Sequence, residues 1–125
     1  MANYTKTNLR EVENQAPNFG MPDEMKARFA RNDIEGKTLG LSLFTLDPGF
    51  RIPFGHKHSN QEEVYFVVKG SGMMRIDGEE IELRPGRFVR VDPGATRVLV
   101  SGADGLESVT FGAPIDSQYE PPSWG

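Results

Sequence analysis

The sequence predicts an all-β fold of short antiparallel strands, arranged as a sandwich or a barrel, and three observations support this prediction. Short apolar segments follow one another from about residue 38 onward. Turn-forming stretches such as DPGF, GSG, RPG, DPGA and GADG separate them, and the chain contains 14 glycines and 9 prolines. The length of 125 residues suits one compact domain and is short for two.

The expected strands are rich in β-branched and aromatic residues, which favour a pleated, half-buried surface. They cover residues 39–46, 63–68, 73–76, 80–83, 88–91, 97–100 and 107–112. The Asp-Gly pair at residues 77–78 suits a two-residue type I′ hairpin turn. A hairpin with this turn pairs Met74 with Ile81 on an apolar face. It pairs Arg75 with Glu80 on the opposite, charged face.

The segment EVYFVV is apolar on both faces, because Val64 and Phe66 alternate with Tyr65 and Val67. A strand with two apolar faces needs cover on both sides. We expect one face to line a barrel and the other to meet a second sheet or a second subunit. The sequence therefore predicts a homodimer.

A short N-terminal helix is expected before the first strand, in the segment MPDEMKARFA at residues 21–30. It has a proline and two acidic residues in its first turn, and Met21, Met25 and Phe29 lie four residues apart on one stripe. We expect this helix to close one end of the barrel.

The expected domain organisation has three parts. Residues 1–37 form an N-terminal arm whose short helix packs on the barrel, residues 38–113 form the β-barrel domain, and residues 114–125 form a tail. The tail is polar and rich in proline, with Tyr119 and Trp124 as packing anchors.

Composition excludes several classes of function. A formal net charge of -4, without a dense run of Lys or Arg, argues against nucleic-acid binding. The sequence lacks an apolar run long enough for a membrane span and an apolar core typical of a signal peptide, so a cytoplasmic location is expected. Without cysteine there is no disulfide and no thiolate, and a metal would need His, carboxylate or water as ligands.

The two histidines of the chain, His56 and His58, lie two residues apart. In an extended segment they share a face and could coordinate one ion. The alternative is that the two histidines face solvent or form hydrogen bonds. Glu63 begins the next strand on the face shared with Tyr65 and Val67, which we assign to the interior. A buried carboxylate needs a partner, and a cation satisfies it directly.

The stretch GFRIPFGHKHSNQEEVYFVVKG resembles the first motif of the cupin family, Gly-x5-His-x-His-x(3,4)-Glu-x6-Gly. Its two histidines, Glu63 and Gly70 are in place, whereas Gly49 lies one residue too far upstream. The resemblance covers about residues 38–113 and implies a double-stranded β-helix, the cupin jelly-roll barrel.

The second cupin motif, Gly-x5-Pro-x-Gly-x2-His-x3-Asn, matches residues 86–101 only in part. Gly86 and Gly94 agree with the motif, and Pro93 is shifted by one residue. Arg97 falls where the family has its fourth metal ligand, a histidine, and Ser101 falls where it has asparagine.

Cupins with an intact site typically bind a metal through three histidines and one glutamate inside the barrel. The resemblance therefore implies that His56, His58 and Glu63 bind a divalent transition metal, with iron, manganese, nickel and zinc as candidates. Two histidines and one carboxylate are also the ligand set of many non-haem iron oxygenases.

Arg97 leaves three alternatives open. It could lie beside a three-ligand metal and clamp an anionic substrate, or it could pair with Glu63 in a metal-free barrel. It could also point outward, because the alternation in TRVLV favours Val98 and Val100 inside, whereas the cupin resemblance favours Arg97 inside. A local bulge could reconcile these two patterns.

The function predicted is a small cupin with a barrel metal site, acting as a metal-dependent oxygenase, such as a dioxygenase, or as an isomerase on a small anionic molecule. Arg97 and Tyr65 are the candidate substrate-binding residues, with barrel packing as the alternative role for Tyr65. The alternative function is a metal-free, small-ligand-binding cupin in which Arg97 replaces the metal ligand, so whether the protein is an enzyme stays open.

Overall fold

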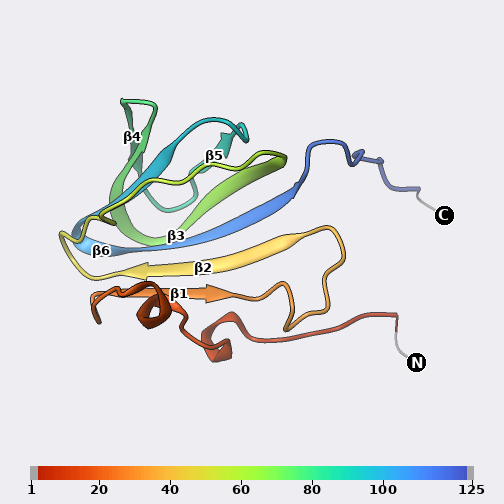
Figure 1. The fold of residues 1–125 in the computed structure, drawn as a ribbon, viewed down its shortest axis with the longest axis horizontal. Helices are drawn as coiled ribbons and strands as arrows, with labels where there is room; N and C mark the ends of the chain where they lie inside the picture. Colours follow the sequence, from red (N-terminus) through yellow and green to blue (C-terminus); the bar gives the residue numbers. More distant parts are fainter. Residues whose placement is uncertain (1–2, 124–125) are drawn as a thin grey trace.

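The computed structural model describes residues 3–123, and nearly all of its regular structure is antiparallel β-sheet (Figure 1). One six-stranded sheet has the order β1-β2-β6-β3-β4, and β5 also pairs with β3. The all-β class and the jelly-roll fold predicted from the sequence are confirmed. The strands are β1 (Met25–Phe29), β2 (Gly40–Leu46), β3 (Gln61–Ile76), β4 (Glu79–Leu83), β5 (Phe88–Val91) and β6 (Arg97–Pro114).

Two pairs of expected short strands are joined into the long, bent strands β3 and β6 (Figure 1). The GSG stretch, expected as a turn, is instead an irregularity within β3, where the pairing register with β6 shifts between Gly70 and Gly72. The GADG stretch lies in β6 opposite this irregularity. Extra residues in one strand bend a sheet without ending it, so both strands continue around the barrel.

The hairpin between β3 and β4 has the predicted turn and register. Asp77 and Gly78 have φ of 47° and 88°, the left-handed conformation that a type I′ turn requires at both central residues. Met74 pairs with Ile81 and is fully buried, so the apolar face of this hairpin lines the interior.

The helix predicted for residues 21–30 is wrong, because Met25–Phe29 forms strand β1, paired antiparallel with β2. Met25 and Ala27 are buried while Lys26 and Arg28 are half-buried, which is the two-residue period of a strand. Pairing with β2 satisfies the backbone of the whole segment, whereas an isolated helix of this length is marginal. The helical turns of the arm lie earlier, in η1 (Leu9–Glu11) and η2 (Ala16–Phe19).

The expected division into arm, barrel and tail stays a prediction, although β1 of the arm is part of the barrel sheet. In the tail, Tyr119 is 85% exposed and does not act as a packing anchor. The other anchor expected there, Trp124, lies outside the described residues.

The N-terminal arm covers one part of the outer face of the sheet. Val12 and Leu43 are buried although neither belongs to the interior apolar cluster. The Arg10 guanidinium donates two hydrogen bonds to the Glu107 carboxylate, at 2.7 and 2.9 Å. These hydrogen bonds, outweighing a smaller effect of burial, hold the pKa of Glu107 below its ordinary value.

We expect Glu107→Gln to lower the free energy of unfolding by about 1 kcal/mol at pH 7, as for a partly screened ion pair. Because folding lowers the pKa of Glu107, its contribution is present above the ordinary glutamate pKa of 4.5 and is lost as the pH falls through the folded value. Urea denaturation of both proteins should therefore show a difference at pH 7 that shrinks towards pH 3. An equal difference at both pH values would contradict this role.

The rest of the outer face, on β3, β5 and β6, carries exposed apolar side chains. The rings of Phe66 and Phe88 lie 4.5 Å apart, and Phe88 is 64% exposed. Phe111 and Val68 are exposed on the same sheet, and antiparallel pairing places Phe111 beside Val64. The face of EVYFVV that was expected to need cover is thus only partly covered within one chain.

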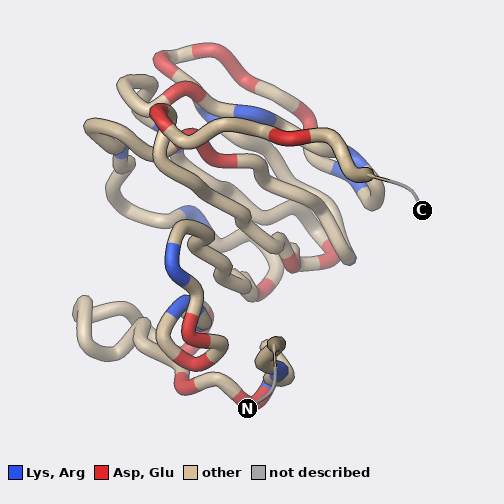
Figure 2. The backbone as a smooth tube through the Cα atoms, turned by 90° about the vertical axis from the view of Figure 1, so that its right-hand side faces the viewer, with Lys and Arg blue, Asp and Glu red and all other residues tan. Residues whose placement is uncertain are grey.

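Charged residues of both signs are interspersed along the described backbone (Figure 2). This distribution differs from the one-signed basic stripe typical of nucleic-acid-binding surfaces. None of the helices within residues 3–123 is long and apolar enough to cross a membrane.

Candidate metal centre

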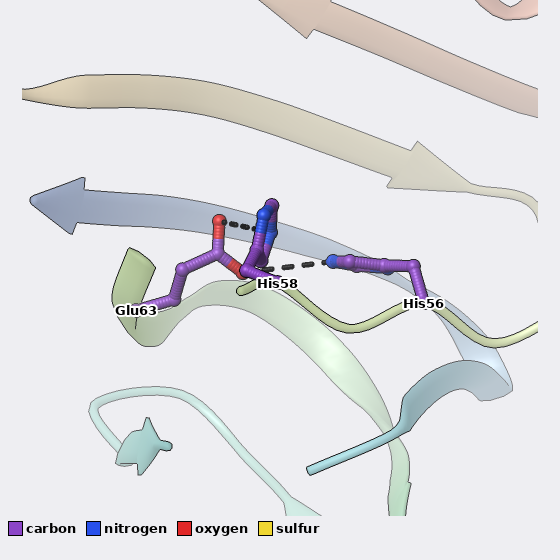
Figure 3. A group of neighbouring side chains, drawn as sticks. All are labelled: His56, His58 and Glu63. Atoms are coloured by element: carbon purple, nitrogen blue, oxygen red, sulfur yellow. Dashed lines mark ion pairs between the residues drawn. The ribbon is translucent and has the colours of Figure 1, made fainter. Parts of the chain in front are cut away.

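Two histidines and one glutamate converge at the barrel cavity (Figure 3). The loop that carries the histidines lies against β6 and its preceding turn: the backbones of His56 and Arg97 exchange hydrogen bonds of 3.1 and 3.0 Å. The backbone N–H of His58 donates to the Pro93 carbonyl at 2.8 Å. Glu63 is the third residue of β3, and its side chain points towards both imidazoles.

The distances among these groups fit a shared metal ion. Nε2 of His56 lies 3.6 Å from Oε1 of Glu63, and Nε2 of His58 lies 3.3 Å from Oε2. All three ligand atoms lie within 4.8 Å of one another. Ligand atoms that share an ion at about 2.1 Å are separated by roughly 3 to 4 Å, so only small adjustments would be needed.

The environment of His58 is also consistent with a bound metal ion. Its Nε2 atom is buried and makes no hydrogen bond within residues 3–123, despite its closeness to Glu63. A buried polar nitrogen without a partner is costly, and coordination of a cation would satisfy it. The donor set of two imidazoles and one carboxylate suits iron, manganese, nickel or zinc.

Tyr65 holds the carboxylate in place. Its hydroxyl donates to Oε1 of Glu63 at 3.0 Å and lies 3.3 Å from Nε2 of His56. Burial, reinforced by the negative charge of Glu63, raises the pKa of Tyr65 far above its ordinary value. The hydroxyl therefore stays protonated and remains a donor to Glu63. Its predicted role in binding substrate stays a prediction, although the side chain does line the cavity.

Glu63 is an ionised acceptor at neutral pH. Burial by itself would raise the pKa of its carboxyl group, but contacts with His56 and the hydrogen bond from Tyr65, together with His58, more than offset this effect. The pKa of Glu63 therefore lies below its ordinary value. An anionic carboxylate is the form that binds a cation.

Arg97 points into the barrel and is only 1% exposed. Leu99 and Ser101 are buried on the same face, whereas Val98 and Val100 are half-buried on the other. The alternation-based expectation of valines inside, and with it the outward orientation of Arg97, is wrong. Leu99 pairs with the fully buried Met74, so its face of β6 is the interior one, and no bulge is needed between Arg97 and Ser101.

The buried guanidinium of Arg97 is only partly satisfied. Nη2 donates to the Asp92 carbonyl at 3.1 Å and lies 4.0 Å from Oε1 of Glu63. Nε and Nη1 are buried and make no hydrogen bond in the part of the chain that the structure describes. Because a buried cation with free donors is costly, Arg97 is suited to receive an anion.

These groups face a cavity of about 550 Å³, within the range of roughly 300 to 1,000 Å³ typical of small-molecule sites. Its polar part also includes Thr110, whose buried Oγ1 makes no hydrogen bond within residues 3–123. Thr110 and the aromatic lining residues Phe19 and Phe29 were not predicted as site residues. Phe29 could have been identified as a site residue by interpreting MKARF as a strand with alternating side chains.

The cavity, the two histidines that line it and the jelly-roll sheet define a barrel protein of the cupin type. A family model described as a cupin domain matches residues 42–104, half of the chain. The protein therefore belongs to the cupin family.

Solved structures agree with this fold. A cupin protein from Bacteroides fragilis superimposes with a TM-score of 0.80 at 24% identity, over 98% of this chain and 93% of that chain. A sugar phosphate isomerase of the cupin superfamily from Silicibacter pomeroyi gives 0.69 at 22% identity, over 86% and 74%. A predicted oxalate decarboxylase from Thermotoga maritima gives 0.68 at 19% identity, over 86% and 96%.

Among curated proteins, an uncharacterised protein of Methanocaldococcus jannaschii is 37% identical over 38 residues. The match spans 30% of this chain and 30% of that relative.

Proposed function

We propose that the protein binds one divalent transition metal through His56, His58 and Glu63 and uses it to act on a small anionic molecule, as an oxygenase or an isomerase. The observation that carries the proposal is the convergence of three ligand atoms within 4.8 Å at a cavity. The sugar phosphate isomerase and the predicted oxalate decarboxylase with similar folds add support, since sugar phosphates and oxalate are anions.

The protein groups have separable tasks in this proposal. His56, His58 and Glu63 would hold the metal, which supplies Lewis acidity and coordination positions open to substrate. Tyr65 keeps the Glu63 carboxylate oriented by its 3.0 Å hydrogen bond. Arg97 has two buried donor nitrogens without hydrogen bonds among the described residues, and these would bind a carboxylate or phosphate group.

The metal site is tested with untagged protein incubated separately with Fe(II), Mn(II), Ni(II) and Zn(II), followed by removal of loose ions and elemental analysis. We expect about one ion per chain for at least one metal. Glu63→Gln preserves side-chain shape but weakens the negative ligand, and it should lower metal affinity at least tenfold. Glu62→Gln is the matched control, because Glu62 is exposed on the opposite face of β3. No retained ion, or equal retention in Glu63→Gln, would contradict the proposal.

A metal-free binding module is the second candidate function, favoured by the 4.0 Å separation of Arg97 Nη2 from Glu63 Oε1. A guanidinium cannot ligate a metal, and in this alternative it neutralises Glu63 in place of an ion. Ligand binding would then be insensitive to chelators, and wild-type protein would retain none of the four metals.

We also propose that two copies associate through the exposed apolar face of β3, β5 and β6, the homodimer expected from the sequence. Charge supports a second copy as the occupant. Glu62, Arg90 and Asp92 carry a net single negative charge at one end of this face, and Lys69, Arg10 and Glu107 carry a net single positive charge at the other. A two-fold axis between the ends would bring opposite charges together. A cytoplasmic location remains part of the proposal.

The dimer is tested with Phe88→Asp, which places a charge on the apolar face beside Phe66. We expect wild type to sediment as a dimer at about 50 µM and Phe88→Asp to sediment as a folded monomer, because Phe88 is exposed in the single chain. Leu39→Asp, at an exposed apolar residue elsewhere, is the control. A monomeric wild type would refute the dimer.

A further inference from the structure

The cavity has an aromatic side as well as a polar one. Phe19 from η2, Phe29 from β1 and Phe44 from β2 all line it. Their rings form an edge-to-face array, with centroids 6.2 Å apart for Phe19 and Phe29 and 5.9 Å apart for Phe29 and Phe44. Phe54 and Ile52 line the cavity as well.

Core packing does not account for three of these rings, those of Phe19, Phe29 and Phe54, whereas Phe44 packs against the buried interior cluster. Phe19 is 55% exposed, Phe29 is 42% exposed and Phe54 is 52% exposed, although all three line a concave site. The interior cluster of buried apolar side chains includes none of the three. Exposed aromatic rings gathered around one cavity present apolar surface that a ligand can cover.

The polar side offers donors and acceptors that the protein leaves unused. Nε and Nη1 of Arg97, together with Oγ1 of Thr110, are buried without hydrogen bonds among the described residues. Nε–H and Nη1–H diverge on the planar guanidinium, so a carboxylate accepts from one of them, and makes two parallel hydrogen bonds only if the second N–H of Nη2 takes part. The cavity therefore pairs one anion-binding position with an apolar wall.

We infer that the ligand is an amphipathic carboxylic acid, with its carboxylate at Arg97 and an apolar body about the size of a phenyl ring against Phe19, Phe29 and Phe44. The inference rests on the proposed function only in placing the anionic group in this cavity. A polyhydroxylated acid fits less well, because its hydroxyl groups would face phenyl rings without partners. The aromatic wall thus selects the body of the ligand, while Arg97 selects its charge.

The test uses the full chain as purified, with its metal content determined, and three probes in titration calorimetry: 3-phenylpropanoate, acetate and gluconate. We expect 3-phenylpropanoate to bind at least tenfold more tightly than either of the others, because burial of its ring adds apolar contact. A Phe19→Ser, Phe29→Ser double variant should lose about tenfold in affinity for 3-phenylpropanoate and keep its weak affinity for acetate. Leu39→Ser, which alters an exposed apolar residue that does not line the cavity, should leave the affinity for 3-phenylpropanoate unchanged.

Three results would overturn the inference. The first is gluconate or acetate binding as tightly as 3-phenylpropanoate, and the second is an unchanged affinity for 3-phenylpropanoate in the double variant. The third is no detectable binding of 3-phenylpropanoate at a concentration of about 10 mM. Thermal unfolding of the double variant checks that the fold is intact, which its exposed positions favour. Metal retention separates this inference from the proposed function. Retained metal without a preference for the phenyl acid refutes the inference alone, and the preference without retained metal refutes the metal-dependent function alone.

Discussion

Gly70→Ala should lower the free energy of unfolding by at least about 3 kcal/mol, the largest loss of stability expected from a single methyl group in this chain. Gly70 has a φ of 84°, a conformation that a side chain strains. A Cβ there would lie 2.1 Å from the Gly105 carbonyl oxygen and 2.8 Å from its carbon. Both are backbone atoms of the paired strand β6, so the neighbour cannot rotate away.

Substitutions at two other glycines distinguish the steric clash of an added Cβ from the strain of a positive φ. Gly78 has a φ of 88°, and no atom lies within 4 Å of the position that a Cβ would take, so Gly78→Ala should cost only about 1 kcal/mol. Gly94 has neither a positive φ nor a close neighbour, and Gly94→Ala should change stability by less than about 0.5 kcal/mol. Urea denaturation of the three variants measures their free energies of unfolding and tests this order. A Gly70→Ala protein as stable as Gly78→Ala would show that β3 and β6 do not approach so closely.

Arg97→His should raise the affinity for a divalent metal at least tenfold. Position 97 lies directly beside His56 in the backbone pairing, and its side chain points into the cavity. An imidazole there would add a fourth protein ligand to His56, His58 and Glu63 and would remove a positive charge 4.0 Å from the Glu63 carboxylate. Both changes favour a bound cation.

The measurement is the dissociation constant for Zn(II) or Ni(II), determined by competition with a chromophoric chelator. Arg97→Met is the matched control, because it removes the charge and adds no imidazole. Affinity that rises more in Arg97→His than in Arg97→Met indicates ligation by the new histidine. Equal affinity in Arg97→His and wild type would mean that position 97 does not face the metal ligands.

Local sequence patterns predicted much of the sheet correctly. The Asp77-Gly78 turn was predicted with its register, because the left-handed φ of both residues is a property of this dipeptide. Strands β2, β4 and β5 lie within one residue of their expected limits. The candidate metal ligands were also found locally, since His56 and His58 lie two residues apart and Glu63 follows after one short turn.

The errors concern segments whose structure depends on distant partners. In residues 21–30 a helical stripe of Met21, Met25 and Phe29 competes with a strand alternation, and pairing with β2 decides in favour of the strand. The glycines at the centre of β3 suggested a turn. Instead they permit the close approach of β6, which only the paired strand requires.

The sequence by itself determined the all-β class, the hairpin and the clustering of two histidines with a glutamate, because each depends on residues close together in the chain. Only the tertiary structure decided the direction of Arg97, because the alternation in TRVLV and the cupin resemblance favoured opposite faces of the strand. That choice follows from the pairing of Leu99 with the buried Met74 on β3. The aromatic wall likewise exists only after folding, which brings Phe19, Phe29 and Phe44 from three separate elements to one cavity.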